Sequence, residues 1–153
     1  MITYYKFRGK QYKTGEWLVG DLIHFRNDVM ILPLDADWFD FVPRKNNPLR
    51  LPSDRFVVDK ATVGQFTGLH DKNGKEIYEG DIIKIVEEFD DENVYTRIGV
   101  VCFEEGMYEL QDKNGKHFAY LGWLMHDDAI TKLEVIGNIH DNPELLEKGG
   151  QNK

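Results

Sequence analysis

The sequence predicts a mainly β protein with a small β-barrel core, an N-terminal β-meander and a short C-terminal helix. Short runs rich in β-branched and aromatic residues recur along the chain, and turn-forming groups separate them. Residues 65–85 show both features, because they contain Asn73-Gly74, a Glu-Gly-Asp corner at 79–81 and an alternating apolar run. This combination is typical of the tight turns of a small barrel.

Composition limits the class of protein. The chain has 153 residues, of which 41% are hydrophobic and 12% aromatic, enough for one domain or a small domain with an appendage. No apolar run approaches the roughly 20 residues that span a bilayer, and residues 1–8 lack a secretory pattern, so we expect no membrane association. The single cysteine, Cys102, excludes an intrachain disulfide and predicts a cytoplasmic protein.

The net charge of −8 is unevenly distributed. Residues 1–63 carry 10 Lys and Arg against 8 Asp and Glu, whereas residues 64–153 carry 9 against 19. An acidic second half disfavours non-specific binding to the phosphate backbone of nucleic acid. The asymmetry would let copies of the chain pack head to tail or attract a basic partner. The simpler interpretation, which we favour here, is solubility.

Proline predicts an internal boundary. Four of the five prolines, Pro33, Pro43, Pro48 and Pro52, fall within 20 residues, and proline cannot donate to the ladder of a central strand. Residues 35–54 therefore read as a long irregular segment. We divide the chain into an N-terminal β unit (1–34), a proline-rich and aromatic connection (35–62) and a β-barrel domain with its helix (63–148).

The N-terminal unit is predicted to contain three or four strands in a meander. Residues 13–16 and 26–28 supply the turns. The expected strands are residues 4–7, 17–19, 22–25 and 29–32.

The C-terminal domain shows regular turn signals. Asn73-Gly74 predicts a type I′ hairpin, and the five residues at 71–75 recur unchanged at 112–116. Because their flanks differ, we interpret the repeat as reuse of one turn. The expected strands are residues 56–58, 63–66, 82–86, 95–103, 107–110, 117–121 and 133–139.

Little helix is expected. Residues 125–131 are predicted to form one or two turns. Residues 142–148 are predicted to form a terminal helix with Asn142 as the cap and Pro143 at the first position. Phe118 and Trp123 are predicted to lie in the core, as are the isoleucines near residue 83.

Two separated segments, residues 65–82 and 133–146, resemble the YopX family of phage and prophage proteins. Gly99-Val100-Val101 also matches, whereas Phe7-Arg8-Gly9-Lys10 keeps only part of the family's opening strand. The resemblance implies an SH3-like β-barrel core and a tendency to self-associate. It supplies no catalytic residues that could be transferred to this chain.

The residues of this sequence, considered apart from the resemblance, give little support for a metal site or a catalytic site. His70, Glu76, Glu79 and Asp81 would need to converge to bind a metal, and we favour the view that they serve turns, with Asp81 bonding local amides. The acidic residues 87–93 lack the spacing of a calcium loop. Cys102 with His126 or His140 would make a nucleophile and base only with suitable geometry, and we favour the view that Cys102 is a small buried hydrophobic residue of a strand. We expect no metal, no cofactor and no enzyme.

Aromatic residues in the connection are the candidate partner-binding site. Trp38, Phe39 and Phe41 suit contact with a partner. We favour the alternative that they fill the core between the two β units, and a further possibility is that they cover a neighbouring subunit.

Two functions remain open. The first is a non-enzymatic, self-assembling or protein-binding module, forming a homo-oligomer or binding a phage or host protein. The second is a nucleic-acid-associated role through the basic residues Lys6, Arg8, Lys10 and Lys13. Mimicry of DNA by the acidic surface is a third idea without specific support.

Overall fold

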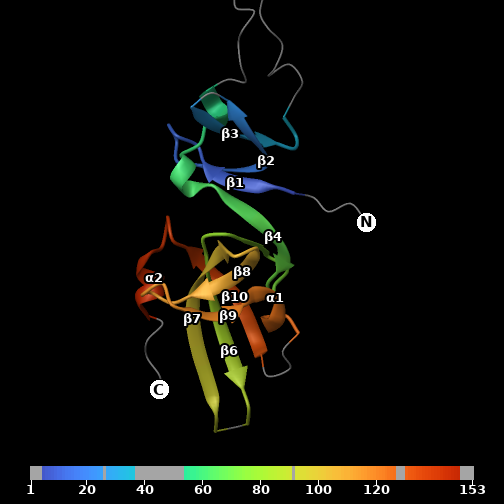
Figure 1. The fold of residues 1–153 in the computed structure, drawn as a ribbon, viewed down its shortest axis with the longest axis vertical. Helices are drawn as coiled ribbons and strands as arrows, with labels where there is room; N and C mark the ends of the chain where they lie inside the picture. Colours follow the sequence, from blue (N-terminus) through green and yellow to red (C-terminus); the bar gives the residue numbers. More distant parts are fainter. Residues whose placement is uncertain (1–4, 26, 37–53, 91, 127–129, 149–153) are drawn as a thin grey trace, which may run out of the picture. The chain divides into compact units, whose positions relative to one another are not determined.

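The computed structural model describes residues 5–25, 27–36, 54–90, 92–126 and 130–148. The chain divides into two compact units, residues 1–65 and residues 66–153 (Figure 1). The described residues form antiparallel strands with a few helical turns. The predicted mainly β class is therefore confirmed.

The first unit is built on a meander of three strands, as predicted, although the first strand lies three residues later than the predicted 4–7. Strands β1 (Phe7–Lys10), β2 (Trp17–Phe25) and β3 (Asp28–Pro33) pair in sequence order. Two predicted strands, 17–19 and 22–25, are one continuous strand, because Gly20 keeps its pairing with both Phe7 and Pro33. The start of β4 (Gly64–His70) pairs with the outer side of β1.

Residues 54–62 belong to the first unit rather than to a loose connection. They form two 3₁₀ turns, Asp54–Phe56 and Lys60–Thr62. The strand predicted at 56–58 is reduced to two isolated bridges, Gln11↔Val58 and Met30↔Val57. Val58 is buried with Val29 and Ile31 in the core of this unit. The C-terminal end of the predicted 35–62 connection is thus packed, because its valines complete that core.

The second unit contains a five-stranded antiparallel sheet in the order β10-β6-β7-β8-β9. Its strands are β6 (Asp81–Glu88), β7 (Val94–Glu104), β8 (Met107–Gln111), β9 (His117–Tyr120) and β10 (Ile130–Asn138). The remainder of β4 pairs with β5 (Glu76–Tyr78). A closed SH3-like barrel is not confirmed, because β10 and β9 remain the two ends of the sheet in the described residues.

The core of the second unit gathers aliphatic side chains from β5, β6, β7, β8 and β10 and from the helix α1 (Leu121–Leu124). Its buried members are Ile77, Ile83, Ile85, Val101, Leu110, Leu121, Leu124, Leu133 and Val135. Phe118 packs against this cluster, and Ile82 is also fully buried, so both core predictions are confirmed.

Trp123 was predicted to be a core residue, and this prediction is wrong. Its side chain is 71% exposed. Leu121 and Leu124, three positions apart, are the residues of α1 that enter the core. A single helical turn can direct only one side inwards, so Trp123 lies on the other side.

The repeated turns differ from the predicted type I′ geometry. At residues 71–75 and 112–116 positive φ is confined to the glycines, Gly74 at 78° and Gly115 at 75°. The aspartate at the start of each turn bonds the following backbone amides instead. Two consecutive residues with positive φ, as a type I′ turn requires, occur at Glu105 (50°) and Gly106 (85°) between β7 and β8.

The helices are shorter than predicted and begin at different residues. α1 covers 121–124, whereas the prediction placed helix at 125–131, where β10 already begins at Ile130. The predicted short C-terminal helix is present as α2 (Glu144–Glu147). Pro143 occupies its cap position in place of Asn142. Within the described residues, no helix has the length and hydropathy needed to cross a bilayer.

Candidate functional site

The predicted partner-binding residues Trp38, Phe39 and Phe41 lie outside the described residues. Their prediction is therefore not tested by the structure. Two cavities, one in each unit, are the candidate sites among the residues that the structure does place.

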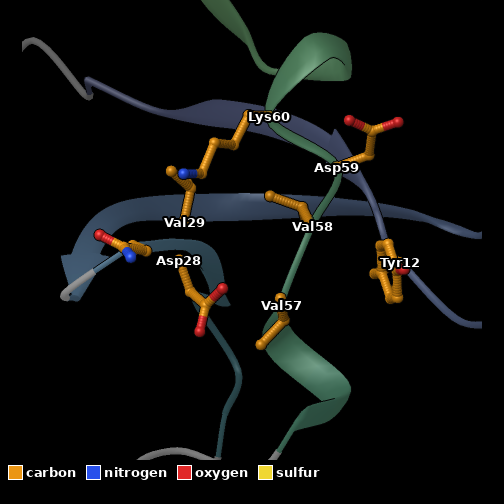
Figure 2. A pocket seen from close by; sticks show the side chains of 8 residues that line it. Tyr12, Asp28, Val29, Val57, Val58, Asp59 and Lys60 are labelled. Carbon is orange, nitrogen blue, oxygen red and sulfur yellow. The ribbon is translucent and has the colours of Figure 1, made fainter.

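The cavity of the first unit has a volume of about 370 Å³. Figure 2 shows an apolar floor of valines between β3 and the segment that joins the two 3₁₀ turns. Its rim carries charges of both signs, and one of them, Asp59, already accepts a hydrogen bond from the Ala61 N–H at 3.0 Å. The lining residues are Tyr12, Asn27, Asp28, Val29, Val57, Val58, Asp59 and Lys60. A mixed rim of this kind does not select one ligand charge.

The cavity of the second unit has a volume of about 410 Å³ and a more uniform chemistry. Strand register explains how it forms, because Glu104 pairs with Met107, Glu109 with Tyr120 and Gln111 with His117. Paired residues of adjacent strands project to the same face of a sheet. The lining residues are Glu104, Glu105, Met107, Glu109, Gln111, His117 and Tyr120.

Glu109 is the buried carboxylate of this cavity, with an exposed fraction of 8%. One oxygen, Oε1, accepts a hydrogen bond from Gln111 Nε2 at 2.9 Å, and the other, Oε2, lies 3.0 Å from His117 Nδ1. These two contacts hold the carboxylate in one orientation. A buried carboxylate with two partners is stable where an unpaired one would not be.

Aromatic rings form one wall of the same cavity. The ring of His117 lies 4.5 Å from the ring of Tyr120, measured between centroids. Tyr120 in turn contacts Trp123 edge to face at 4.9 Å. The exposed Trp123 therefore extends an aromatic surface outwards from the cavity.

The surroundings of the cavity are electronegative. Burial raises the pKa of the Cys102 thiol to about 11, and the carboxylates of Glu79, Glu104 and Glu109 add to the increase. Burial also raises the pKa of Tyr108, with a further contribution from Glu79. Glu104 and Glu105 form no ion pair with the part of the chain that the structure describes. The site is suited to a cation.

The raised pKa of Cys102 weakens the idea of a nucleophile with His126 or His140. Only a thiolate attacks as a nucleophile, and this thiol remains protonated at neutral pH. Cys102 is half-buried in β7, opposite Glu109. The predicted place in a strand is confirmed, but the residue is half-buried rather than fully buried as predicted.

The turn role predicted for Asp81 is confirmed. Its Oδ2 accepts a hydrogen bond from the Tyr78 N–H at 2.8 Å, and Tyr78 Oη donates to Glu76 Oε2 at 2.7 Å. In the acidic segment 87–93, Asp90 Oδ1 accepts from the backbone of Glu92 at 3.0 Å. Among the described residues no three potential ligands converge as a metal site would require.

The basic residues of the first unit are partly engaged with their neighbours. Arg8 Cζ lies 4.8 Å and Lys10 Nζ 5.5 Å from the centroid of a Trp17 ring. Lys13 Nζ lies 3.1 Å from Asp54 Oδ2. The grouping predicted from sequence therefore includes a cation–π cluster on β1 and β2.

Sequence reasoning missed the cavity of the second unit. The alternation of Met107, Glu109 and Gln111 with Tyr108 and Leu110 was the available signal, since it assigns polar residues to one face of β8. The contribution of β9 follows only from strand register, which the alternation of one strand does not give.

Comparison with known proteins gives a matching family and similar solved structures. The model of a family described as "YopX protein" matches residues 6–147. A crystal structure of protein EF1440 from Enterococcus faecalis is similar at 23% sequence identity, covering 94% of this chain and 98% of that chain, with a TM-score of 0.45. No curated protein matches.

Proposed function

Because the chain belongs to the YopX family over residues 6–147, we propose that it is a non-enzymatic module that associates with itself or binds another protein. The observation that carries the proposal is the exposure of Trp123, 71%, beside an electronegative cavity. Exposed aromatic residues next to shaped polar cavities are typical of protein interfaces.

Other exposed apolar residues of the second unit support the same proposal. Phe89 (64% exposed) and Tyr95 (47%) contact each other near the end of the β6–β7 hairpin, and Phe103 is 49% exposed on β7. These side chains gain by being covered, because each removes apolar surface from water when it is buried. The SH3-like description of this unit is part of the proposal and is supported by its short antiparallel strands and tight turns.

The proposed setting is the cytoplasm of a bacterial host carrying the phage or prophage. The single free cysteine and the family membership support it. The partners are a second copy of the chain, or a phage or host protein. The charge contrast between residues 1–63 and 64–153 supports association of unlike surfaces.

Light scattering on the purified protein, with and without Trp123→Ser, tests the proposal. We expect the wild type to be heavier than a monomer, or to bind a partner in an affinity capture from host cells repeated with the purified candidate. The variant should lose this association while its circular dichroism stays unchanged. A monomeric wild type with no reproducible partner would refute the module.

A second candidate is a nucleic-acid-associated role for the first unit. The cluster of Arg8 and Lys10 over Trp17 favours it, since aromatic and cationic groups together bind single strands. It ranks second because Lys13 is already paired with Asp54. A gel-shift assay at low ionic strength tests it, and the absence of salt-sensitive binding would exclude it.

A further inference from the structure

We propose that the cavity bounded by β7, β8 and β9 binds the guanidinium group of an arginine side chain presented by a basic partner protein. This inference rests on the proposed function and specifies the chemistry of the partner. It is drawn from the shape of the cavity, the arrangement of its carboxylates and its aromatic wall.

The volume of the cavity is large enough for one side chain. At about 410 Å³ the cavity falls within the range of small-ligand sites. Met107 of β8 supplies an apolar, adaptable surface in the lining of the cavity. The methylene stem of an arginine buries along such a surface while its charged end goes deeper.

The carboxylates of the cavity differ in burial, and all of them can accept hydrogen bonds. Glu109 is buried and held by Gln111 and His117, so its carboxylate is already oriented before a ligand binds. Glu104 and Glu105 stand at the β7–β8 turn and have no ion pair within the described residues. A guanidinium carries five N–H donors in a planar fork, which matches one or two carboxylates at once.

The aromatic wall distinguishes arginine from lysine. Tyr120 lines the cavity, with His117 against one part of its ring and Trp123 against another. A guanidinium stacks on aromatic faces and is weakly hydrated, whereas an ammonium is compact and strongly hydrated. A partly enclosed site with both carboxylates and rings therefore favours arginine.

The net negative charge of the second unit also favours a cationic ligand. Residues 64–153 carry 19 Asp and Glu against 9 Lys and Arg. Burial is the main cause of the raised pKa of Cys102, and the negative charges of Glu79, Glu104 and Glu109 add to it. An anionic ligand would meet repulsion at this site, and a basic segment would be attracted before contact.

Calorimetric titration with three acetylated, amidated pentapeptides tests the proposal. The peptides differ only in the central residue between glycines: arginine, lysine or citrulline, which keeps the shape of arginine without its charge. We expect the arginine peptide to bind and the citrulline peptide to bind about tenfold more weakly. The lysine peptide should lie between them.

Two double variants with equal charge change locate the binding. Glu104→Gln with Glu105→Gln removes two carboxylates at the cavity, and Glu88→Gln with Glu92→Gln removes two exposed carboxylates from the β6–β7 hairpin. We expect the first pair to weaken arginine-peptide binding about tenfold and the second to change it less than about twofold.

Three results would overturn the proposal: no binding of the arginine peptide, equal binding of the lysine or citrulline peptide, or equal loss in both double variants. The last would show only general attraction to an acidic protein. If the arginine peptide does not bind while the wild type still associates in light scattering, this inference is wrong and the proposed interaction module is retained. If both fail, the proposed function falls as well.

Discussion

The carboxylate of Asp71 joins a tight turn to a strand 64 positions later in the chain. Its Oδ2 accepts a hydrogen bond from the Val135 N–H at 3.1 Å. Its Oδ1 accepts from the N–H groups of Asn73 at 2.8 Å and Lys75 at 2.9 Å. One buried side chain therefore shapes the β4–β5 connection and attaches it to β10.

The repeated turn provides a comparison within the same molecule. Asp112 accepts from Asn114 at 2.8 Å and Lys116 at 3.0 Å in the same way, but it is only half-buried. We expect Asp71→Ala to lower the free energy of unfolding by about 2 kcal/mol, because the buried Val135 N–H loses its acceptor. Asp112→Ala should cost less. Urea unfolding measures both, and equal losses would contradict the role of the bond to Val135.

Stability should depend on the ionisation of Asp71. Burial raises its pKa, but the N–H groups of Val135, Lys75 and Asn73 outweigh burial and hold the pKa below the usual 3.8. A carboxyl group with a lower pKa in the folded state stabilises the fold above its unfolded pKa and loses this effect as the pH falls through the folded pKa.

The expected result is a difference in unfolding free energy between wild type and Asp71→Asn that is full at pH 7. It should narrow below about pH 4. Urea titrations from pH 7 to pH 2 measure it. A difference that stays constant over this range would show that ionisation of Asp71 does not contribute.

Gly99 is expected to be intolerant of a side chain. A Cβ at this position in β7 would lie 2.6 Å from Phe118 Cε1 and 3.0 Å from the Gln111 carbonyl oxygen. Gly99→Ala should therefore lower the free energy of unfolding by about 1–3 kcal/mol. Thermal or urea unfolding measures the change.

Gly122 is the matched control, because a Cβ there would meet open space on α1. Gly122→Ala should be neutral or stabilising by up to about 1 kcal/mol. A loss of stability at Gly122 equal to that at Gly99 would contradict the steric explanation.

Cys102 should react slowly with alkylating reagents. Its pKa of about 11 means that few thiolates are present at pH 8. With one cysteine in the chain, iodoacetamide labelling followed by mass spectrometry reports this site alone. The rate should rise about tenfold per pH unit between pH 7 and pH 10. A rate that levels off near pH 8 would contradict the raised pKa.

Two residues of α1 should separate stability from association. Leu121 is fully buried, so Leu121→Ala should cost about 2–5 kcal/mol of unfolding free energy. Trp123→Ser should leave that quantity within about 0.5 kcal/mol, because the ring is exposed. Unfolding curves recorded beside light scattering measure both effects. A large loss of stability in Trp123→Ser would place the ring in the core after all.

Local sequence signals predicted most of the strands. The alternating or apolar runs that became β3, β6, β7 and β8 were located to within one or two residues of the observed ends. The prediction divided β2 into residues 17–19 and 22–25, although Gly20 between them pairs on both sides. Residue type alone does not report whether a glycine ends a strand or continues it.

Turn geometry was predicted less well. Asn73-Gly74 has the composition of a type I′ turn, but the carboxylate of Asp71 captures the amides of the turn and leaves positive φ to Gly74 alone. Glu105, a residue with no preference for positive φ, occupies that conformation instead. At residues 71–75 the hydrogen bonds of the Asp71 side chain decided the geometry of the turn.

The sequence by itself determined the β class, the meander, the isoleucine-rich core and the membership of a family, because these depend on local alternation and on motifs in order. Only the tertiary structure decided that Asp71 is buried while Asp112, in the identical turn, is half-buried. It also decided that Trp123 faces solvent and that Glu109, His117 and Tyr120 line one cavity. These outcomes depend on strand register and on which side of an element meets the core, and both are set by contacts between residues far apart in the chain.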